Sequence, residues 1–216
     1  PKPKDYVLDL GCGIGFWSNL FVNKFKIKKI ISADLSSKSL KICKLRVKNT
    51  IIKKENAEKL SFSKNTFDHI NCQGVIHHSP NTTACVDEIF RVLKNGGTAS
   101  VSVYYKNIIL KSISRLIVLI NFLGKYLTKN MGRGRDFSNV KNINDLVRLY
   151  DGNKNPIGKA YSKNEFELML IRAGFVNIEI NYFFFPFRFM KFKIPNFLRF
   201  IIVYLFPFMI VANIKK

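Results

Sequence analysis

The sequence predicts an α/β fold built around an open, mostly parallel β-sheet. Through the first hundred residues, short apolar runs alternate with segments whose apolar residues recur at helical spacing. The first run, residues 6–10, breaks into a glycine-rich turn before the first helical segment. This alternation is typical of strands that are buried on both faces and joined by helices. The 216 residues suffice for one domain with a substantial core and one inserted subdomain.

The first crossover is the most informative stretch of the chain. Tyr6 to Leu10 has the pattern of a buried strand, and Gly11, Gly13 and Gly15 follow on alternate positions. Glycine is expected there because a Cβ would clash with a ligand and forbid the tight backbone angles. A strand, a glycine turn and a helix in this order place backbone N–H groups and a helix N-terminus around a ligand. The helix is indicated by apolar residues at Phe16, Leu20, Phe21 and Phe25.

The spacing of acids and glycines selects the ligand. A dinucleotide fingerprint places its third glycine where this chain has Phe16, so that fingerprint fails. Asp9 precedes the glycines, and a carboxylate there would repel a diphosphate but suit a ligand that carries an ammonium group. Asp34 follows a second apolar run, 29–33, about 20 residues beyond the glycines, the distance at which an acid reaches ribose hydroxyls. Asp34 also suits the start of the next helix, and the two interpretations are compatible.

The motif Asp-Leu-Gly-Cys-Gly-Ile-Gly that begins at Asp9, with Asp34 in register, resembles motif I of the class I S-adenosylmethionine-dependent methyltransferases, in particular the type 11-like family. The resemblance implies that S-adenosyl-L-methionine is the cofactor. It implies that the methionine portion is held by Asp9, Gly11, Cys12, Gly13 and Gly15, and that Asp34 and Leu35 lie at the ribose side.

Two further stretches extend the resemblance. Residues 55–62 match the family pattern Asp-Ala-Glu-x-Leu-Pro-Phe, except that Asn56 replaces the acid expected to accept from the adenine amino group. Asn56 still offers a carbonyl acceptor without a charge, so adenine contacts are expected at Asn56 and Ala57. After a strand at 67–72, the loop 73–80 resembles the family's Val-Leu-His-His loop. Contacts on the methionine side opposite motif I are expected from Cys72, Gln73 and Val75.

The remaining elements complete the predicted sheet. Strands are indicated at 51–52 and 98–105. Residues 91–97 resemble Arg-Val-Leu-Lys-Pro-Gly-Gly and should end a helix over 83–93 at a glycine stop. Further on, a capping box at 162–165 opens a helix, and strands are expected at 176–185 and 208–214. The resemblance implies a Rossmann-like, seven-stranded, mostly parallel sheet of order 3-2-1-4-5-7-6, with helices on both faces, a final antiparallel pair and a helical insertion after strand 5.

These elements divide the chain into three predicted parts. Residues 1–105 would form the cofactor-binding core, and 106–161 an inserted substrate lid. Residues 162–216 would complete the core and carry a basic, aromatic insert at 186–207. The chain begins with Pro1 and enters its first strand after five residues, so we expect it to be part of a longer polypeptide whose preceding segment helps to cover the cofactor.

Candidate catalytic residues come from the loop after the fourth strand. His77 and His78 are expected near the reacting methyl group, where a histidine could take a proton from an acceptor or simply position it. Positioning is favoured because methyl transfer from a sulfonium needs little acid–base help, and His77 is slightly preferred. Substrate contacts are expected at Tyr105, Arg133, Arg135 and Tyr161, although plain solvation of the two arginines is the default alternative.

The formal charge of +22 invites two explanations. Compositional drift accounts for lysines spread through the first hundred residues, whereas the basic residues after 105 are regional. The basic aromatic insert could lie at an anionic membrane interface or pack as ordinary core, and both interpretations stay open. A membrane-spanning helix is not expected, because the longest apolar run, 200–212, is short and contains Pro207. The four cysteines show no metal-ligand spacing, so reduced, buried thiols and no metal are expected.

The sequence therefore predicts an S-adenosylmethionine-dependent methyltransferase that acts on a small-molecule, glycan-precursor or lipid-linked acceptor. Nucleic acid is disfavoured, because the Asn/Asp-Pro-Pro-Tyr signature of amino-directed enzymes is missing and no proline precedes Cys72, as it would in cytosine-5 enzymes. A non-catalytic module that binds the cofactor or a membrane surface is the alternative. We expect a cytoplasmic protein, with peripheral contact at the inner face of the membrane if the basic insert is interfacial.

Overall fold

The protein is described by a computed structural model that covers residues 1–124, 128, 136–152, 155–184 and 194–216. Its described strands are β1 (Tyr6–Leu10), β2 (Lys29–Asp34), β3 (Ile51–Lys54), β4 (Phe67–Gln73), β5 (Leu93–Tyr105), β6 (Ala160–Tyr161), β7 (Val176–Phe183) and β8 (Met209–Lys215). Its described helices are α1 (Phe16–Asn23), α2 (Ser37–Arg46), the 3-10 helix η1 (Ile76–His78), α3 (Thr82–Val92), α4 (Ile108–Gly124), α6 (Ile143–Tyr150), α7 (Lys163–Ala173) and α8 (Asn196–Leu205).

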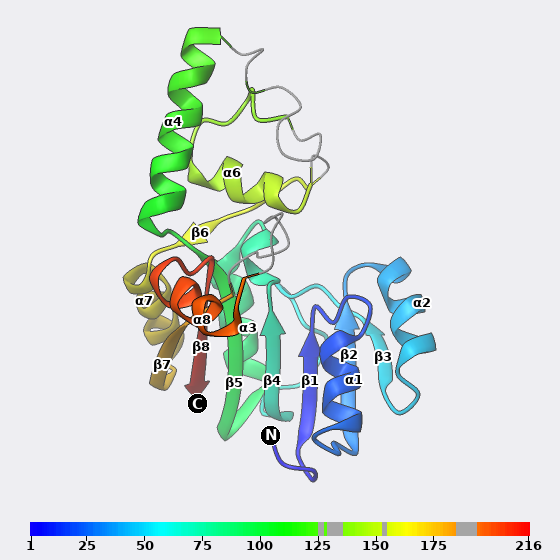
Figure 1. Ribbon diagram of the computed structural model, residues 1–216. Helices are drawn as coiled ribbons and strands as arrows, with labels where there is room; N and C mark the ends of the chain where they lie inside the picture. The colour runs from blue at the N-terminus through cyan, green and yellow to red at the C-terminus, as the bar shows by residue number, and fades with distance from the viewer. Residues whose placement is uncertain (125–127, 129–135, 153–154, 185–193) are drawn as a thin grey trace. The chain divides into compact units, whose positions relative to one another are not determined.

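The described strands form one sheet with the order β3-β2-β1-β4-β5-β8-β7 (Figure 1). The predicted sixth and seventh strands are β7 and β8, so the predicted order is confirmed. One strand was not predicted: the two-residue β6 pairs with the end of β5 and makes the sheet eight-stranded. The pairs among β1 to β5 are parallel. The bonds Gly96 N to Lys216 O and Tyr105 N to Phe208 O show that the C-terminal strand runs antiparallel to β5.

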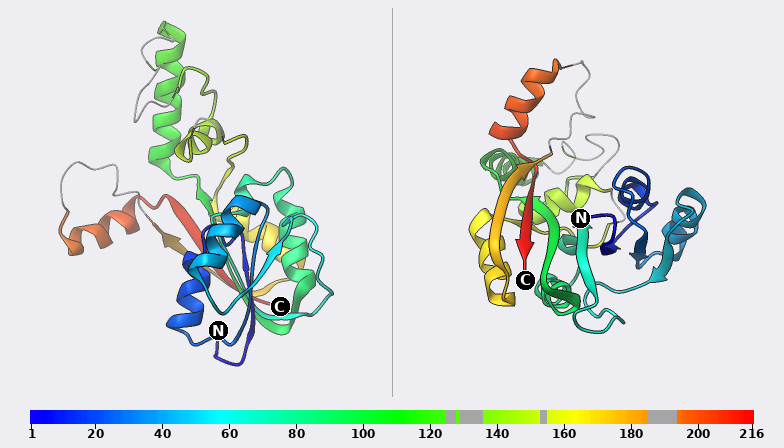
Figure 2. Two further views of the ribbon diagram at one scale, coloured as in Figure 1. Left: turned by 90° about the vertical axis from the view of Figure 1, so that its right-hand side faces the viewer. Right: turned by 90° about the horizontal axis from the view of Figure 1, so that it is seen from below.

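Strand β1 lies at the centre of the parallel part of the sheet. Four of its five residues are buried, because both of its neighbours are strands and helices cover both faces. The left view of Figure 2 shows α1 and α3 on opposite sides of the strands. On the α1 side, Val7, Phe21, Ile27 and Ile30 form a core cluster. In register, Asp9 of β1 stands between Ser32 of β2 and Asn71 of β4.

Two features of the helices were not predicted. Of the apolar residues that indicated the first helix, Phe16 is 60% and Phe25 is 40% exposed. Phe16 lies more than a quarter-turn around α1 from the buried Ser18 and Phe21, and Phe25 lies two residues beyond Asn23, the last residue of the helix. The glycines at 96 and 97 do not stop α3, because that helix already ends at Val92, and both glycines lie within β5 beside a register shift.

Two compact units make up the chain, and each is described separately. The first comprises residues 1–102, 167–180 and 211–216, and the second comprises 103–166 and 181–210. The described parts of the predicted lid and of the basic insert therefore both belong to the second unit. There, Ser162 and Glu165 form the expected capping box, with Ser162 N donating to Glu165 Oε2 at 2.7 Å and Glu165 N donating to Ser162 Oγ at 3.2 Å. Within the described ranges, no helix has the length and apolarity needed to cross a bilayer.

Candidate functional site

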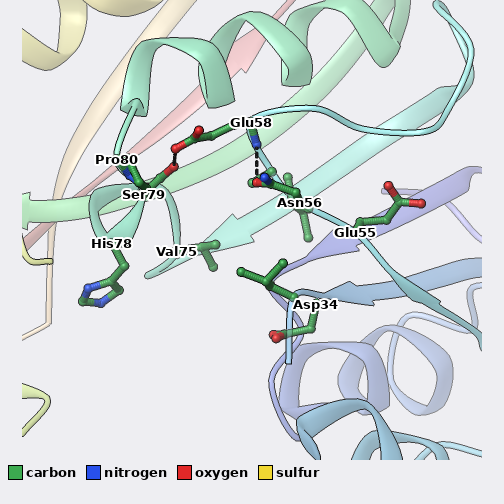
Figure 3. Close-up of a pocket in the computed structure, with 12 residues that line it drawn as sticks. Asp34, Glu55, Asn56, Glu58, Val75, His78, Ser79 and Pro80 are labelled. Carbon is green, nitrogen blue, oxygen red and sulfur yellow. Dashed lines mark hydrogen bonds between the residues drawn. The ribbon is translucent and has the colours of Figure 1, made fainter. Parts of the chain in front are cut away.

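A pocket of about 350 Å³ opens in the first unit where β1, β2 and β4 end (Figure 3). The carboxyl ends of parallel strands are where open α/β sheets bind their ligands. The pocket is lined by Leu10, Gly11, Asp34, Leu35, Glu55, Asn56, Ala57, Glu58, Val75, His78, Ser79 and Pro80. The sequence predicted seven of these twelve residues. Figure 3 shows Asp34 and His78 on opposite sides of the opening.

The glycine turn is held tightly against β2. Gly11 N and Cys12 N both donate to Ala33 O, at 2.7 and 2.9 Å. Gly11 has a φ of +71°, and a Cβ there would lie 2.2 Å from Val75 Cγ2. Gly13 also has a positive φ, +52°, but a Cβ there would meet nothing within 4 Å. Glycine is therefore required at position 11 by both packing and conformation, and at position 13 by conformation alone.

Asp34 joins the glycine turn to the start of α2. Its Oδ2 accepts from Gly13 N at 2.9 Å, and its Oδ1 accepts from Ser36 N at 2.8 Å. Ser36, rather than Asp34, caps α2, because its Oγ accepts from Ser39 N. Each carboxylate oxygen has two lone pairs, so Asp34 keeps acceptor capacity toward the pocket.

Asp9 does not line the pocket, and its expected direct contact with the ligand is not supported. Its side chain is 1% exposed, and it accepts from Ser18 Oγ at 2.5 Å and from Asn71 Nδ2 at 2.8 Å. Ser32 Oγ extends the network by donating to Ser18 Oγ at 2.6 Å. Burial raises the pKa of the Asp9 carboxyl, and the bonds from Ser18 and Asn71 offset part of that rise. Asp9 therefore fastens α1 to the sheet beneath the glycine turn, while the turn itself stays open to the pocket through Gly11.

Three other predicted cofactor residues face the core or a neighbouring helix. Cys12 packs with Leu40, Cys43 and Val47, and a Cβ at Gly15 would lie 2.7 Å from Cys43 Sγ. The absence of a side chain at Gly15 therefore lets the glycine turn pack closely against α2. Cys72 is completely buried, and burial raises the pKa of its thiol. All four cysteines are free and buried, as predicted.

Gln73 and Gly13 lie near the pocket but are not among its lining residues. The Gln73 amide is engaged with β5, where Nε2 donates to Ser100 O at 3.1 Å and to Ser100 Oγ at 3.0 Å. The next residue is also held by β5, because Gly74 N donates to Ser102 Oγ at 2.9 Å. These bonds fix the path of the chain into Val75, which does line the pocket.

The predicted adenine segment lies in the wall. Asn56 Oδ1 accepts from Glu58 N at 3.0 Å, so the side chain that replaces the expected acid closes a local turn (Figure 3). Glu58 in turn accepts from Ser79 Oγ and from Asn81 N at 2.7 Å, which ties this segment to the loop after β4. Glu55 is buried and accepts from Ser61 N at 2.9 Å.

Arg91 on α3 clamps the same segment from outside the pocket. Its guanidinium donates to Leu60 O at 3.0 Å and to Phe62 O at 2.8 Å. It also pairs with Glu88 at 2.6 Å, and Glu88 accepts from Leu60 N at 2.6 Å. The pair lowers the pKa of Glu88 and raises that of Arg91, mainly through their mutual hydrogen bond. The arginine of the Arg-Val-Leu-Lys motif thus positions residues 55–62.

The two candidate histidines lie in different surroundings. His78 lines the pocket, whereas His77 is 0% exposed and is not among the lining residues. Their rings contact each other edge to face, with centroids 4.2 Å apart. Both belong to η1, where successive side chains point in different directions, so only one of the pair can face the opening.

None of the expected substrate residues is among the described residues that line the pocket. Tyr105 and Tyr161 belong to the second unit, where they are paired in register between β5 and β6. The Tyr105 ring also packs against Tyr182, with centroids 5.5 Å apart, and partial burial raises the pKa of Tyr105. Arg133 and Arg135 lie outside the described residues.

Five lining residues were not predicted: Leu10, Glu55, Glu58, Ser79 and Pro80. Each lies within two positions of a predicted residue in the sequence, so that proximity was the signal that could have found them. Within the described ranges, no group of three or more His, Cys, Asp or Glu side chains is arranged to hold a metal ion.

Comparison with known proteins agrees with this geometry. Residues 8–101 match the family described as "Methyltransferase domain". The demethylmenaquinone methyltransferase of Lactococcus lactis subsp. lactis is 28% identical over 170 residues, which cover 66% of this chain and 63% of that protein. The chain thus spans less than two thirds of that relative. The ubiquinone/menaquinone biosynthesis C-methyltransferase UbiE of Wigglesworthia glossinidia brevipalpis is 26% identical over 190 residues, covering 82% and 74% of the two chains.

Solved structures show the same fold. An S-adenosylmethionine-dependent methyltransferase from Mesorhizobium loti superposes with a TM-score of 0.67 at 17% identity, covering 100% of this chain and 93% of that one. The Haemonchus contortus phosphoethanolamine N-methyltransferase 2, solved in complex with S-adenosyl-L-methionine, gives a TM-score of 0.63 at 15% identity, covering 100% and 49%. Residues 8–101, which carry motif I and the predicted adenine segment, thus match a methyltransferase-domain family, and the chain has the fold of S-adenosylmethionine-dependent methyltransferases of known structure.

Proposed function

We propose that this protein transfers a methyl group from S-adenosylmethionine to a small or lipid-linked acceptor. One observation carries the proposal: the described residues that line the pocket include Asp34, Glu55 and Glu58 but no Lys or Arg, in a chain with 36 basic residues. Such a wall disfavours a diphosphate and favours a ligand with an ammonium and a sulfonium group. The preference for a ligand with an ammonium group, which the sequence predicted from Asp9, is therefore proposed to come from the acids that line the pocket.

The residues present fit the cofactor of this family. The bare backbone at Gly11 and the open space at Gly13 leave room beside the end of β1. Asp34 would hold the ribose hydroxyls with its remaining acceptor capacity, and Asn56 with Ala57 would hold the adenine. S-adenosylmethionine supplies an electrophilic methyl group on a positively charged sulfur. The apolar Leu10 and Val75 would exclude water beside it.

His78 is the residue proposed to meet the acceptor. It faces the opening across from Asp34, and its ring nitrogens can donate to or accept from a hydroxyl group of the acceptor that lies beside the reacting atom (Figure 3). Its proposed role is to position the acceptor, because orientation accounts for most of the barrier reduction in a direct displacement.

The acceptor is proposed from two supports of different kinds. The relatives named demethylmenaquinone methyltransferase and ubiquinone/menaquinone biosynthesis C-methyltransferase align over 66% and 82% of this chain. The second unit also exposes many apolar side chains, including Ile108, Phe122 and Phe200. Both favour an acceptor with a lipid tail over a glycan precursor or a fully water-soluble molecule.

The proposal is tested with S-adenosylmethionine labelled in its methyl group. Purified protein is incubated with demethylmenaquinol, the tail-less 1,4-naphthoquinol and phosphoethanolamine, and label is counted in each acceptor. We expect transfer to demethylmenaquinol that exceeds transfer to the tail-less ring, and we expect His78→Gln to lower turnover roughly 10- to 100-fold while leaving S-adenosylhomocysteine affinity unchanged. Transfer to phosphoethanolamine alone would overturn the lipid-linked acceptor.

A non-catalytic module that binds the cofactor is the second candidate. Asn56 favours it, because the side chain expected to hold the adenine amino group brings no charge and already accepts from Glu58 N. S-adenosylhomocysteine binding without label transfer to any of the three acceptors would support this module over the enzyme. The variant Asn56→Asp bears on the same point, since tighter cofactor binding in the variant would show that the substitution weakens the natural site.

A further inference from the structure

Helix α8 of the second unit is unusually exposed for an apolar helix. None of its ten residues is buried, and Phe197, Phe200 and Tyr204 are 67%, 78% and 66% exposed. Its sequence, Asn-Phe-Leu-Arg-Phe-Ile-Ile-Val-Tyr-Leu, contains one charged residue, Arg199. A helix that is apolar on all sides normally lies in a protein core or in contact with lipid.

The length of α8 limits how it could meet lipid. Ten residues are about half of the roughly 20 that a helix needs to cross the hydrocarbon layer. A short apolar helix with aromatic side chains fits instead at the boundary between headgroups and acyl chains. Tyr204 suits that depth, because its ring is apolar and its hydroxyl is polar.

Helix α4 of the same unit presents a second exposed apolar stripe. Ile108, Leu119 and Phe122 lie close together around the helix and are 77%, 56% and 87% exposed. Lys111 and Arg115, one turn apart, lie on the same face of the helix as that stripe and are also exposed. Long basic side chains beside an apolar stripe can keep their charges among lipid headgroups while their stems cover apolar surface.

The charge of these segments is of one sign. Between residues 106 and 135 the sequence has seven basic residues and no acid, and no acid follows Glu179. The segment that leads into α8 adds Arg188, Lys191 and Lys193 to Arg199. Compositional drift alone would not remove every acid from both stretches, and a basic, apolar surface is complementary to anionic phospholipid.

We propose that α8 and α4 are the membrane-contact surface of this protein, and that their partner is a bilayer containing anionic phospholipid. α8 inserts its aromatic side chains at the interface, and Lys111 and Arg115 contribute attraction to the headgroups. A protein partner or a second copy of this chain would have to offer an apolar groove lined with acids. In the part of the chain that we describe, α4 and α8 carry basic residues and not the acids that such a groove needs, which disfavours a second copy.

Vesicle sedimentation tests the proposal on the whole chain. Vesicles of phosphatidylcholine are compared with vesicles containing about 30 mol % phosphatidylglycerol, at about 0.1 and about 0.5 M salt. We expect at least about tenfold stronger partitioning onto the anionic vesicles, and we expect the higher salt to remove most of that difference. The variant F197S/F200S should lose at least about tenfold in partitioning, and K111Q/R115Q should lose mainly the preference for anionic lipid.

The matched control is I42S/L45S on α2, in the first unit. Ile42 and Leu45 are 44% and 85% exposed, so their replacement removes comparable exposed apolar surface without touching α4 or α8. This control should partition like wild type. All variants should keep the thermal shift caused by S-adenosylhomocysteine, which shows that the first unit is folded and separates a failure here from a failure of the proposed function.

Three results would overturn the proposal. The first is equal partitioning of F197S/F200S and wild type, and the second is partitioning that does not depend on phosphatidylglycerol. The third is a wild type that does not bind vesicles but forms a micromolar dimer, when that dimer dissociates in F197S/F200S. The last result would show that a second copy covers α8.

Discussion

The Asp34 carboxylate reaches across 21 residues of sequence to the glycine turn, where its Oδ2 accepts from Gly13 N at 2.9 Å. Its other oxygen accepts from Ser36 N at 2.8 Å, so one side chain holds both the turn and the start of α2. An acid that also lines the pocket therefore shapes the site before any ligand arrives. This dual role makes Asp34 a sharper test of the site than a residue that only contacts ligand.

Asp34→Asn should weaken S-adenosylhomocysteine binding by at least about tenfold and lower the free energy of unfolding by about 1.5–3 kcal/mol. The amide can accept only through its oxygen, so one of the two backbone N–H groups loses its partner. Isothermal calorimetry and urea denaturation measure the two effects. Asp87→Asn, at an exposed acid on α3, is the control and should change neither. Wild-type affinity in Asp34→Asn would contradict the account.

Gly11→Ala should damage the site far more than Gly13→Ala. At position 11 a methyl group would lie 2.2 Å from Val75 Cγ2 and would also be strained by the positive φ, whereas at position 13 only the strain applies. We expect Gly13→Ala to cost about 1 kcal/mol of stability and to retain measurable cofactor binding. Gly11→Ala should abolish binding in the same calorimetric assay. Equal loss in the two variants would show that the contact with Val75 is not what requires glycine.

Arg91→Lys should weaken cofactor binding although Arg91 does not line the pocket. A lysine cannot reproduce the fork that holds Leu60 O, Phe62 O and Glu88 together, so residues 55–62 lose their fixed position. Arg91 is more than a third exposed, so its ion pair contributes little stability by itself, and we expect roughly a threefold to tenfold loss of affinity with a small change in melting temperature. A large loss of stability with unchanged affinity would assign Arg91 a purely structural role.

Asp9→Asn should change how stability depends on pH. Burial raises the folded-state pKa of Asp9 above its usual 3.8, so the folded protein holds this proton more tightly than the unfolded chain does. Wild type therefore loses stability as pH rises from about 4 through the raised pKa, and the neutral asparagine does not. The neighbouring Asp34 charge acts in the same direction.

Urea denaturation across that pH range measures this effect. The stability of Asp9→Asn minus that of wild type should become more positive as pH rises, whatever its sign at low pH. A difference that stays constant, or that becomes more negative, would show that the Ser18 and Asn71 hydrogen bonds keep Asp9 ionised at no cost.

The fold was largely predictable because its signals are local. Apolar runs, helical spacing and the capping box at Ser162 and Glu165 each depend on a few neighbouring residues, and the strand order followed from the family resemblance. The two-residue β6 carried no comparable signal, because its pairing with β5 is decided by the path of the chain from α6.

The direction of side chains was the harder part. Motif spacing placed Asp9, Cys12 and Cys72 near the ligand, but in a strand or turn covered on both sides the spacing does not reveal which face looks into the pocket. The contact between Glu58 and Ser79 joins residues 21 apart and has no sequence signature. His77 and His78 differ only by their position in η1, so the choice between them needed coordinates.

A pocket whose described lining carries carboxylates and no Lys or Arg should take a sulfonium or thioether cofactor and not a diphosphate. The direct measurement is isothermal calorimetry of the whole chain with S-adenosylmethionine, S-adenosylhomocysteine and NAD. We predict saturable micromolar binding of the first two, lost in Gly11→Ala, and no heat of binding for NAD. Saturable NAD binding, or the same heats in wild type and Gly11→Ala, would contradict the account.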